Sequence, residues 1–276
     1  MKPLNILQEI AAHTKERVEA YKKIVPLNVV AAAARSEGVT EGFPFEKALK
    51  TDDIAFICEV KKASPSKGII ADDFPYVEIA KEYEAAGAAA ISVLTEPAYF
   101  KGDGRYLREI AGAVTIPLLR KDFVVDSYMI YEAKVLGASA VLLICSILDQ
   151  DTLAEYIGVA HSLGLSALVE AHDEDELTMA LRAGARVIGV NNRNLKTFEV
   201  DANNSIRLRK MTPGGIIFVS ESGVRTAEDV ELLRQNKVDA VLIGETLMRS
   251  DNKKAALAEL KGFSQTGPAR GRPVCE

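Results

Sequence analysis

A carboxylate and an ammonium group follow directly after an apolar run near residue 54. The run 54–58 is β-prone and leads into Glu59, Val60 and Lys61. A strand that is apolar at every position is usually buried on both faces, so charges at its end are not expected to be core packing. Alternation along a strand places Glu59 and Lys61 on the same side. Such neighbours form either a structural ion pair or a catalytic pair, and this stretch is compatible with both.

The elements that must position these charges repeat along the chain. Eight apolar runs alternate with amphipathic segments of helical period. This alternation favours a parallel sheet with right-handed crossovers, and eight units over about 210 residues fit a (β/α)8 barrel, an α/β fold, better than an open sheet. The alternative is an open Rossmann-type sheet, but no GxGxxG follows an early strand. The predicted strands are 54–58, 89–94, 116–119, 140–144, 166–169, 187–190, 216–219 and 240–243, and the predicted helices are 76–86, 105–113, 127–136, 152–163, 174–183, 203–211, 227–236 and 253–260.

Residues 1–50 form an N-terminal helical extension that precedes the first strand. Residues 4–23 place apolar side chains at helical spacing, and two shorter helical pieces follow. At the other end, residues 264–276 are rich in Gly, Pro and Arg and are expected to form a disordered tail. We therefore predict one (β/α)8 TIM barrel domain over residues 1–263, with the extension included.

Composition limits the classes of function. Hydrophobic residues make up 48% of the chain, which suffices for a buried core. The formal net charge of −5 gives no overall basic field, so neither nucleic acid nor an anionic membrane is an expected partner. The chain has no run of about 18 apolar residues and no signal-peptide pattern, which favours a cytoplasmic protein. The three cysteines are far apart and lack a CxxC, so they indicate neither a zinc site nor disulfides.

Ionisable residues follow seven of the eight predicted strands. In a (β/α)8 barrel the active site lies at the carboxyl ends of the strands, so we expect these side chains to meet at one mouth. The lysines and arginines among them favour an anionic substrate, while the carboxylates supply acid–base groups. A lysine beside another cation is expected to have a lowered pKa. The cations are Lys61, Lys121 and Arg193, and the carboxylates are Glu59 and Glu170.

Glycines follow the last two predicted strands, at Ser222-Gly223 and Gly244-Glu245. Barrels commonly bind phosphate there through backbone N–H groups, which glycine lets the oxygens approach closely. On this basis Gly244→Val is expected to raise KM far more than it lowers kcat. The carboxylate of Glu245 would repel phosphate, so its side chain must point away or pair with a cation such as Arg249, one helical turn on.

An ordered set of motifs resembles indole-3-glycerol phosphate synthase, the barrel enzyme of the tryptophan pathway. The likeness runs from the N-terminal helix to about Phe263. The motifs are EVKKASPSKG (59–68), LTEPAYFKG (94–102), LRKDF (119–123), LVEAH (168–172), IGVNNRNL (188–195), SESG (220–223) and LIGE (242–245).

The resemblance implies a carbon–carbon lyase that closes the ring of 1-(2-carboxyphenylamino)-1-deoxyribulose 5-phosphate. Carbon dioxide and water leave, and indole glycerol phosphate is formed without a cofactor. No metal is required, and no HExxH or histidine cluster suggests one. The implied partner is a small phosphorylated substrate, and we expect a monomer or a weak homo-oligomer.

The resemblance also implies roles for individual residues. Lys121 acts as the general acid at the ribulose carbonyl, and Lys61 holds the substrate carboxylate and is also proposed to donate a proton. Glu170 takes part in the dehydration, and Glu59 orients the lysines. The remaining matches are Asn191 and Ser222 in the catalytic set, and Ser64, Phe100, Phe123, Arg193, Gly223, Gly244 and Glu245 in the substrate-binding set.

Two other functions remain open at this point. Lys121 beside Asp122 suits the nucleophile of a Schiff-base aldolase or of a sugar-phosphate isomerase, provided that its pKa is depressed. A non-catalytic barrel that binds a phosphorylated ligand is the second alternative. That barrel leaves the set of Glu59, Lys61, Lys121 and Glu170 without a purpose.

Overall fold

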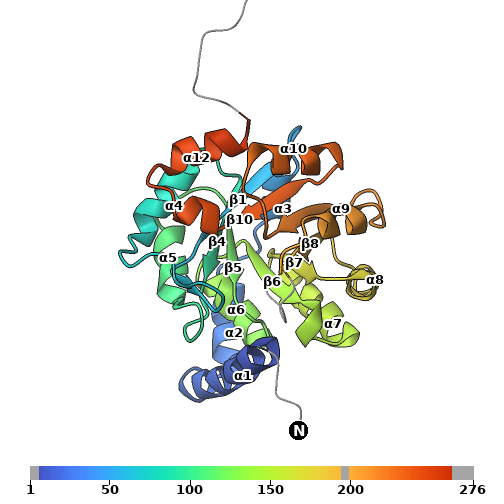
Figure 1. The fold of residues 1–276 in the computed structure, drawn as a ribbon. Coiled ribbons are helices and arrows are strands. Elements are labelled where there is room, and N and C mark those ends of the chain that lie inside the picture. Colours follow the sequence, from blue (N-terminus) through green and yellow to red (C-terminus); the bar gives the residue numbers. More distant parts are fainter. Residues whose placement is uncertain (1–5, 194–198, 263–276) are drawn as a thin grey trace, which may run out of the picture.

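Eight parallel strands close into a barrel in the computed structural model, which describes residues 6–193 and 199–262. Neighbouring strands pair in the order β1-β10-β9-β8-β7-β6-β5-β4, and helices surround them (Figure 1). The predicted (β/α)8 barrel is therefore confirmed, and the open sheet is excluded. The tail predicted over 264–276 lies outside the described residues. The strands are β1 Ala55–Val60, β4 Ala90–Leu94, β5 Leu118–Lys121, β6 Ala140–Ile144, β7 Ser166–Ala171, β8 Val187–Asn191, β9 Ile217–Glu221 and β10 Ala240–Ile243.

The predicted strands match the eight barrel strands in number and differ from them by up to two residues at an end. A short antiparallel pair, β2 Ala63–Ser64 and β3 Gly68–Ile69, was not predicted. β1 runs on through Glu59 and Val60, which pair with Ser92 and Val93 of β4. A charged side chain does not interrupt backbone pairing, so the strand predicted from the apolar run ended two residues too early. β5 begins only at Leu118, after Pro117, which has no N–H to donate to a ladder.

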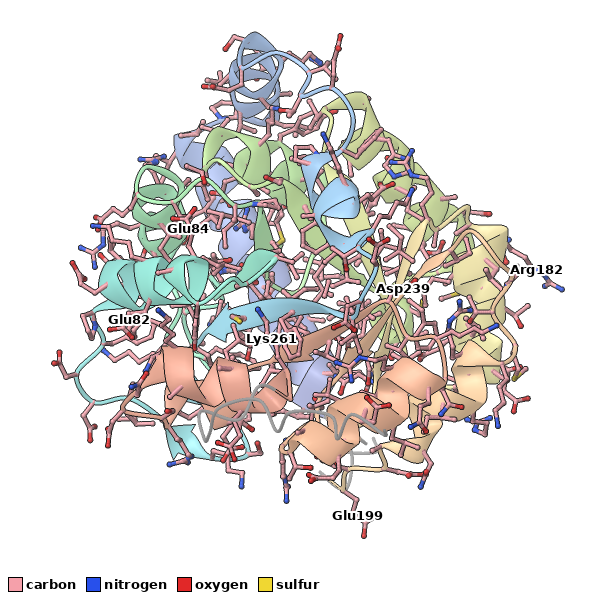
Figure 2. All side chains as sticks on the ribbon, turned by 90° about the horizontal axis from the view of Figure 1, so that it is seen from above. Glu82, Glu84, Arg182, Glu199, Asp239 and Lys261 are labelled. Carbon is pink, nitrogen blue, oxygen red and sulfur yellow. The ribbon has the colours of Figure 1, made fainter. Side chains whose placement is uncertain are left out.

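The outer helices follow the predicted pattern, and several begin with a capping side chain. Asp126, Asp149 and Asp173 each accept a backbone N–H in the first turn of the helix that they precede. In Figure 2, Glu82 and Arg182 lie on opposite sides of the ring of helices, and both are exposed. The helices are α4 Tyr76–Ala85, α5 Gly104–Ala111, α6 Ser127–Val135, α7 Gln150–Ser162, α8 Glu174–Arg182, α9 Asn203–Arg209, α10 Ala227–Gln235, α11 Glu245–Met248 and α12 Lys253–Leu260, with a 3-10 turn η1 Cys145–Ile147.

Alternation along the strands divides the core into two clusters. Side chains such as Phe56, Val141 and Phe218 point outward and pack against the helices. The intervening positions, including Ile57, Leu119 and others, fill the barrel interior. This is the period-two pattern expected for strands buried on both faces.

The N-terminal extension folds as three helices, α1 Ile6–Ile24, α2 Leu27–Ser36 and α3 Pro44–Leu49, of which α1 and α3 cover the two ends of the barrel and α2 packs against α6. Phe45 and Leu49 of α3 join the interior cluster together with residues that begin the strands, so α3 closes the amino end. Leu7 and Ile10 of α1 join the same cluster together with Phe123 and Ile144, at the carboxyl ends. No helix within 6–193 or 199–262 is long and apolar enough to cross a membrane.

Candidate active site

The inward-facing side chains of several strands are apolar along the strand and polar at its carboxyl end. Ile57 is followed two residues later by Glu59, Leu119 by Lys121, and Leu168 by Glu170. Side chains two residues apart lie on the same face of a strand. Because the apolar ones fill the barrel interior, the charged ones that follow them point into its mouth. The folding pattern that makes the core therefore also assembles the charged cluster.

One cavity of about 590 Å³ lies over these strand ends. Every residue that the sequence assigned to catalysis or substrate binding lines it, from Ser64 and Phe100 to Gly244 and Glu245. Their individual roles remain predictions. The sequence did not name the apolar lining residues of α1, and their period-3.6 spacing was the signal that a buried face existed. The apolar lining residues beyond the predicted set are Ile6, Leu7, Ile10, Leu94, Leu142 and Ile144, with others at the rim.

Two lysines and two glutamates form a buried network at the base of the cavity. Glu59 pairs with Lys61 through Oε1, and its Oε2 lies 3.7 Å from Nζ of Lys121. Lys121 Nζ also donates to Oε2 of Glu221 over 2.9 Å. The Glu59 and Glu221 side chains are only 4% and 1% exposed, so these charges depend on one another rather than on water.

The pKa of Lys121 is raised above its usual value, in contrast to the expected lowering. Burial by itself lowers the pKa of Lys121, but the nearby charges of Glu221, Glu59 and Glu170 outweigh it. The sequence expectation considered only the neighbouring cations and omitted the carboxylates. A lysine held as a cation is a poor Schiff-base nucleophile, so this finding disfavours the aldolase alternative.

Glu221 is a site residue that the sequence assignments missed. Ile217 and Val219 of β9 face the barrel interior, and Glu221 follows two residues later on the same face of the strand. This two-residue spacing was the signal that could have identified Glu221 from the sequence. Burial raises the pKa of Glu221; Lys121 lowers it and Glu170 raises it again, with a net value of about 7. Among the described residues, no group makes a hydrogen bond to its Oε1. Glu221 is therefore the carboxyl of this network that changes charge near neutral pH.

We expect the raised pKa of Glu221 to make the free energy of unfolding of the protein depend on pH. A carboxyl whose pKa is raised on folding contributes stability that is fully present below its unfolded pKa and is lost as pH rises through the folded pKa. For Glu221 that window runs from the ordinary value of 4.5 to about 7. The free energy of unfolding of Glu221→Gln, measured with urea relative to the parent, should therefore increase between pH 5 and pH 7.5. A difference independent of pH would contradict the raised pKa.

Glu170 and Asn191 lie on neighbouring strands at the mouth. Nδ2 of Asn191 donates to Oε1 of Glu170 over 3.3 Å, while Oδ1 of Asn191 accepts the backbone N–H of Arg193 over 3.0 Å. Asn191 therefore links the carboxylate of β7 to the loop after β8, and the backbone contact fixes which way its amide is turned.

The two glycine turns line the end of the cavity next to β9 and β10. Ser222 and Gly223 both have positive φ, 66° and 92°. Positive φ is uncommon for a serine and marks a strained turn of the kind that collects at functional sites. Lys67 and Arg225 line the same end and add cations that the sequence assignments did not include.

Glu245 pairs with Arg249, as expected from their spacing. Nε of Arg249 lies 3.1 Å from Oε1 of Glu245, and Nζ of Lys67 lies 3.5 Å from the same oxygen. Burial raises the pKa of Glu245, but these two cations outweigh it and lower the pKa overall. The carboxylate is thus occupied by cations at the edge of the cavity.

Several residues that follow the predicted strands, among them Glu96, Arg120 and Cys145, do not line the cavity. Glu96 is buried and accepts the backbone N–H groups of Ala98, Tyr99 and Phe100, so it shapes the turn that presents Phe100. Arg120 and Cys145 stand at outward positions of the alternation. Arg120 donates to the carbonyl of Met129 and pairs with Glu132 on α6. The expected convergence was wrong for these positions because a residue's place at a strand end does not decide which way it faces.

Asp122 connects the site to the N-terminal helix. Nη2 of Arg17 on α1 lies 2.8 Å from Oδ1 of Asp122, and Thr95 donates to Oδ2 over 2.8 Å. Burial raises the pKa of Asp122, but Arg17 and Arg120 outweigh it and lower the pKa overall. Asp122 thus serves as an anchor for α1 and is not available to activate Lys121 as a base.

A closed (β/α)8 barrel with buried lysines and glutamates at the carboxyl ends of its strands defines a barrel enzyme. The family model described as indole-3-glycerol phosphate synthase matches residues 7–260. The chain belongs to the indole-3-glycerol phosphate synthase family.

Two relatives agree with this membership, and a solved structure shares the fold. A relative from Ruminiclostridium cellulolyticum, named indole-3-glycerol phosphate synthase, is 60% identical over 257 residues, which cover 93% of this chain and 99% of the relative. A second, from Endomicrobium trichonymphae and with the same name, is 56% identical over 256 residues, 93% of this chain and 99% of that one. The solved 3-hexulose-6-phosphate synthase from Salmonella typhimurium has a TM-score of 0.63 at 12% identity, and covers 76% of this chain and 98% of its own. That likeness concerns the fold alone.

Proposed function

We infer that this protein converts 1-(2-carboxyphenylamino)-1-deoxyribulose 5-phosphate into indole glycerol phosphate, with release of carbon dioxide and water. It is a carboxy-lyase of tryptophan biosynthesis. The observation that carries this conclusion is the buried network of Lys61, Glu59, Lys121 and Glu221, set between an apolar wall and two glycine turns. Such a cavity offers an apolar surface for the aromatic ring, cations for the carboxylate, and backbone donors for the phosphate.

Lys121 is our candidate for the general acid at the ribulose carbonyl. An acid must carry its proton when the substrate arrives, and the raised pKa of Lys121 keeps the amine protonated at neutral pH. Lys61 lies at the same cavity wall and is our candidate for holding the substrate carboxylate. Glu59 contacts both lysines and fixes the distance between them.

The apolar wall is our candidate for the aromatic end of the substrate. The rings of Phe100 and Phe123 lie 5.9 Å apart, and Ile10 of α1 lines the same cavity. Ring closure needs the aromatic carbon held close to the carbonyl carbon, and a closely fitting apolar wall restricts that geometry. Arg193 and Ser64 line the polar side, where we expect the anthranilate carboxylate and the sugar.

The test is a direct assay of ring closure. The purified protein is incubated with 1-(2-carboxyphenylamino)-1-deoxyribulose 5-phosphate, and indole fluorescence is followed over time. Product formation supports the proposal. Binding of the substrate without any fluorescence change would favour a non-catalytic barrel, and a borohydride-trapped adduct at Lys121 would favour Schiff-base chemistry.

Glu170→Gln separates proton transfer from binding. The amide keeps the size of the side chain and its contact with Asn191, but it cannot titrate. If Glu170 transfers the proton of the dehydration step, kcat should fall by about 10²- to 10⁴-fold, and a ring-closed, still hydroxylated intermediate should accumulate. Rapid-quench chromatography detects that species. An unchanged kcat with a raised KM would assign Glu170 to binding alone.

Glu245→Ser tests the phosphate end, where we propose that backbone N–H groups of Gly223, Gly244 and Glu245 hold the phosphate. The carboxylate of Glu245 forms ion pairs with Lys67 and Arg249. Its removal therefore leaves these two cations available to the phosphate. We expect KM for the substrate to stay the same or fall, with kcat unchanged. A large rise in KM would show that the Glu245 side chain itself supports the ligand.

We also propose one domain over residues 1–263, a cytoplasmic location, and a monomeric or weakly associating state. The packing of α1 and α3 at the two ends of the barrel supports the single domain. A role in amino-acid biosynthesis supports the location. Light scattering at several concentrations measures the state of association.

A further inference from the structure

His172 lies immediately behind the site and has no part in the roles assigned above. It follows β7, two residues after Glu170, and its side chain is 17% exposed. The imidazole lies between two carboxylates: Nδ1 is 3.0 Å from Oε2 of Glu176, and Nε2 is 3.4 Å from Oε1 of Glu170. His172 does not line the cavity, so any effect on the substrate must pass through Glu170.

The far side of this imidazole is firmly anchored. Glu176, in the first turn of α8, accepts the backbone N–H of His172 over 2.8 Å and the hydroxyl of Ser146 over 2.7 Å. Nδ2 of Asn204 donates to the carbonyl of His172 over 2.9 Å. With its backbone and Nδ1 both held, the ring has little freedom, and Nε2 is aimed at Glu170.

The contact with Glu170 requires a proton. Because Nδ1 donates to the Glu176 carboxylate, the neutral imidazole would present a lone pair from Nε2 to a carboxylate oxygen. That arrangement is favourable only when either His172 or Glu170 carries a proton between them. Nε2 is buried and makes no hydrogen bond to any residue that the structure describes, so Glu170 is its nearest candidate partner.

We propose that His172 is a positioning residue for the reaction, which holds Glu170 in place and sets the pH range in which Glu170 works. This rests on the proposed function of Glu170 in dehydration. The charged imidazole attracts Oε1 of Glu170, which lies 3.4 Å from Nε2 and which also accepts from Nδ2 of Asn191. As His172 loses its proton with rising pH, this attraction is lost and Glu170 becomes free to turn.

The surroundings of His172 favour its charged form. Burial lowers the pKa of His172, but its hydrogen bond to Glu176 and the charges of Glu170 and Glu221 outweigh burial and raise the pKa overall. Ser146 and Asn204 contribute neutral groups, and Lys121 faces Glu170 from across the barrel. The groups that face or influence His172 are thus Glu170, Glu176, Glu221, Ser146 and Asn204.

Two variants distinguish the hydrogen bond of His172 to Glu176 from its contact with Glu170. His172→Asn places an amide nitrogen near the Nδ1 position, so it keeps the hydrogen bond to Glu176 and loses the contact with Glu170. His172→Gln reaches the Nε2 position and can donate to Glu170, but it does not titrate. We expect kcat to fall about 10- to 100-fold in His172→Asn, the range for residues that orient a functional group, with KM little changed. In His172→Gln we expect most of kcat to return.

The pH profile is the readout that a purely structural role would not move. The alkaline limb of kcat should shift in His172→Gln, because the donor to Glu170 no longer titrates. His161→Gln is the matched control: His161 is half-buried against Phe43, away from the cavity, and its replacement should leave kcat and the profile unchanged. Parent-like kcat and pH profiles in both His172 variants would overturn the proposal. So would equal losses in Asn and Gln that merely follow a lower Tm.

A measurement without substrate keeps this inference separate from the proposed function. The imidazole of His172 is titrated by NMR in the parent and in Glu170→Gln. If His172 faces an ionised Glu170, its pKa should drop in Glu170→Gln, and an unchanged pKa would overturn the contact. Failure of the proposed function appears differently, as a parent protein that forms no indole glycerol phosphate.

Discussion

Lys121→Ala is expected to abolish ring closure while the barrel stays folded. Lys121 sits at the end of the interior column of β5 and is the group that bridges Glu59 and Glu221. Loss of a general acid lowers kcat by about 10²- to 10⁴-fold. The fold should survive because Glu221, with its pKa of about 7, can take up a proton when the cation is gone. The measurements are kcat by indole fluorescence and Tm by circular dichroism.

The control for Lys121 is Lys81→Ala, on the exposed face of α4. It removes the same side chain far from the cavity and should leave kcat unchanged. Lys121→Met adds a second variant, which preserves the length of the side chain without its charge. Parent activity in either Lys121 variant would remove Lys121 from the mechanism.

Gly244→Ala is expected to lower kcat, and Gly244→Val to lower it further. The sequence predicted for Gly244→Val mainly a rise in KM, on the ground that the new side chain would meet the phosphate. In the structure a Cβ at Gly244 would overlap Oε1 of Glu59 and lie 2.9 Å from Nζ of Lys61. The glycine therefore leaves room for the buried ion pair as well as for a ligand. Displacing that pair disturbs both lysines, so we expect at least about a 10²-fold loss in kcat, the lower range for acid–base groups.

Gly158→Ala supplies the matched control for Gly244→Ala. Gly158 lies on α7, where a Cβ would meet nothing within 4 Å, and alanine favours a helix over glycine. Its kcat should equal that of the parent, and its Tm should not fall. If Gly244→Ala raised KM alone and kept kcat, the expectation from the sequence would be right and the contact with Glu59 unimportant.

A related glycine shows how the barrel makes room for its buried acids. A Cβ at Gly189 of β8 would overlap Oε1 of Glu221 and approach Cδ1 of Leu168 to 3.2 Å. The apolar run 187–190 gives no sign of this, because a glycine within a strand has several explanations. Only the pairing of β8 with β9 shows that the side chain of Glu221 fills the space beside Gly189.

The sequence by itself determined the barrel, its eight strands and the placement of Glu59, Lys61, Lys121 and Glu170 at its mouth. Local alternation is enough for this, because the residue type at each position records which face of a strand is buried. The same periodicity placed Glu59 beside Lys61, and their ion pair is observed. Spacing within one helix likewise predicted the pairing of Glu245 with Arg249.

The tertiary structure alone decided which strand-end charges face each other and how they titrate. Lys121 and Glu221 are 100 positions apart, and Arg17 and Asp122 are 105 apart, so no local pattern could join either pair. The direction of the Lys121 pKa shift depended on three carboxylates from three other strands. Electrostatic interaction depends on distance through space and on burial, and both arise only when the barrel closes.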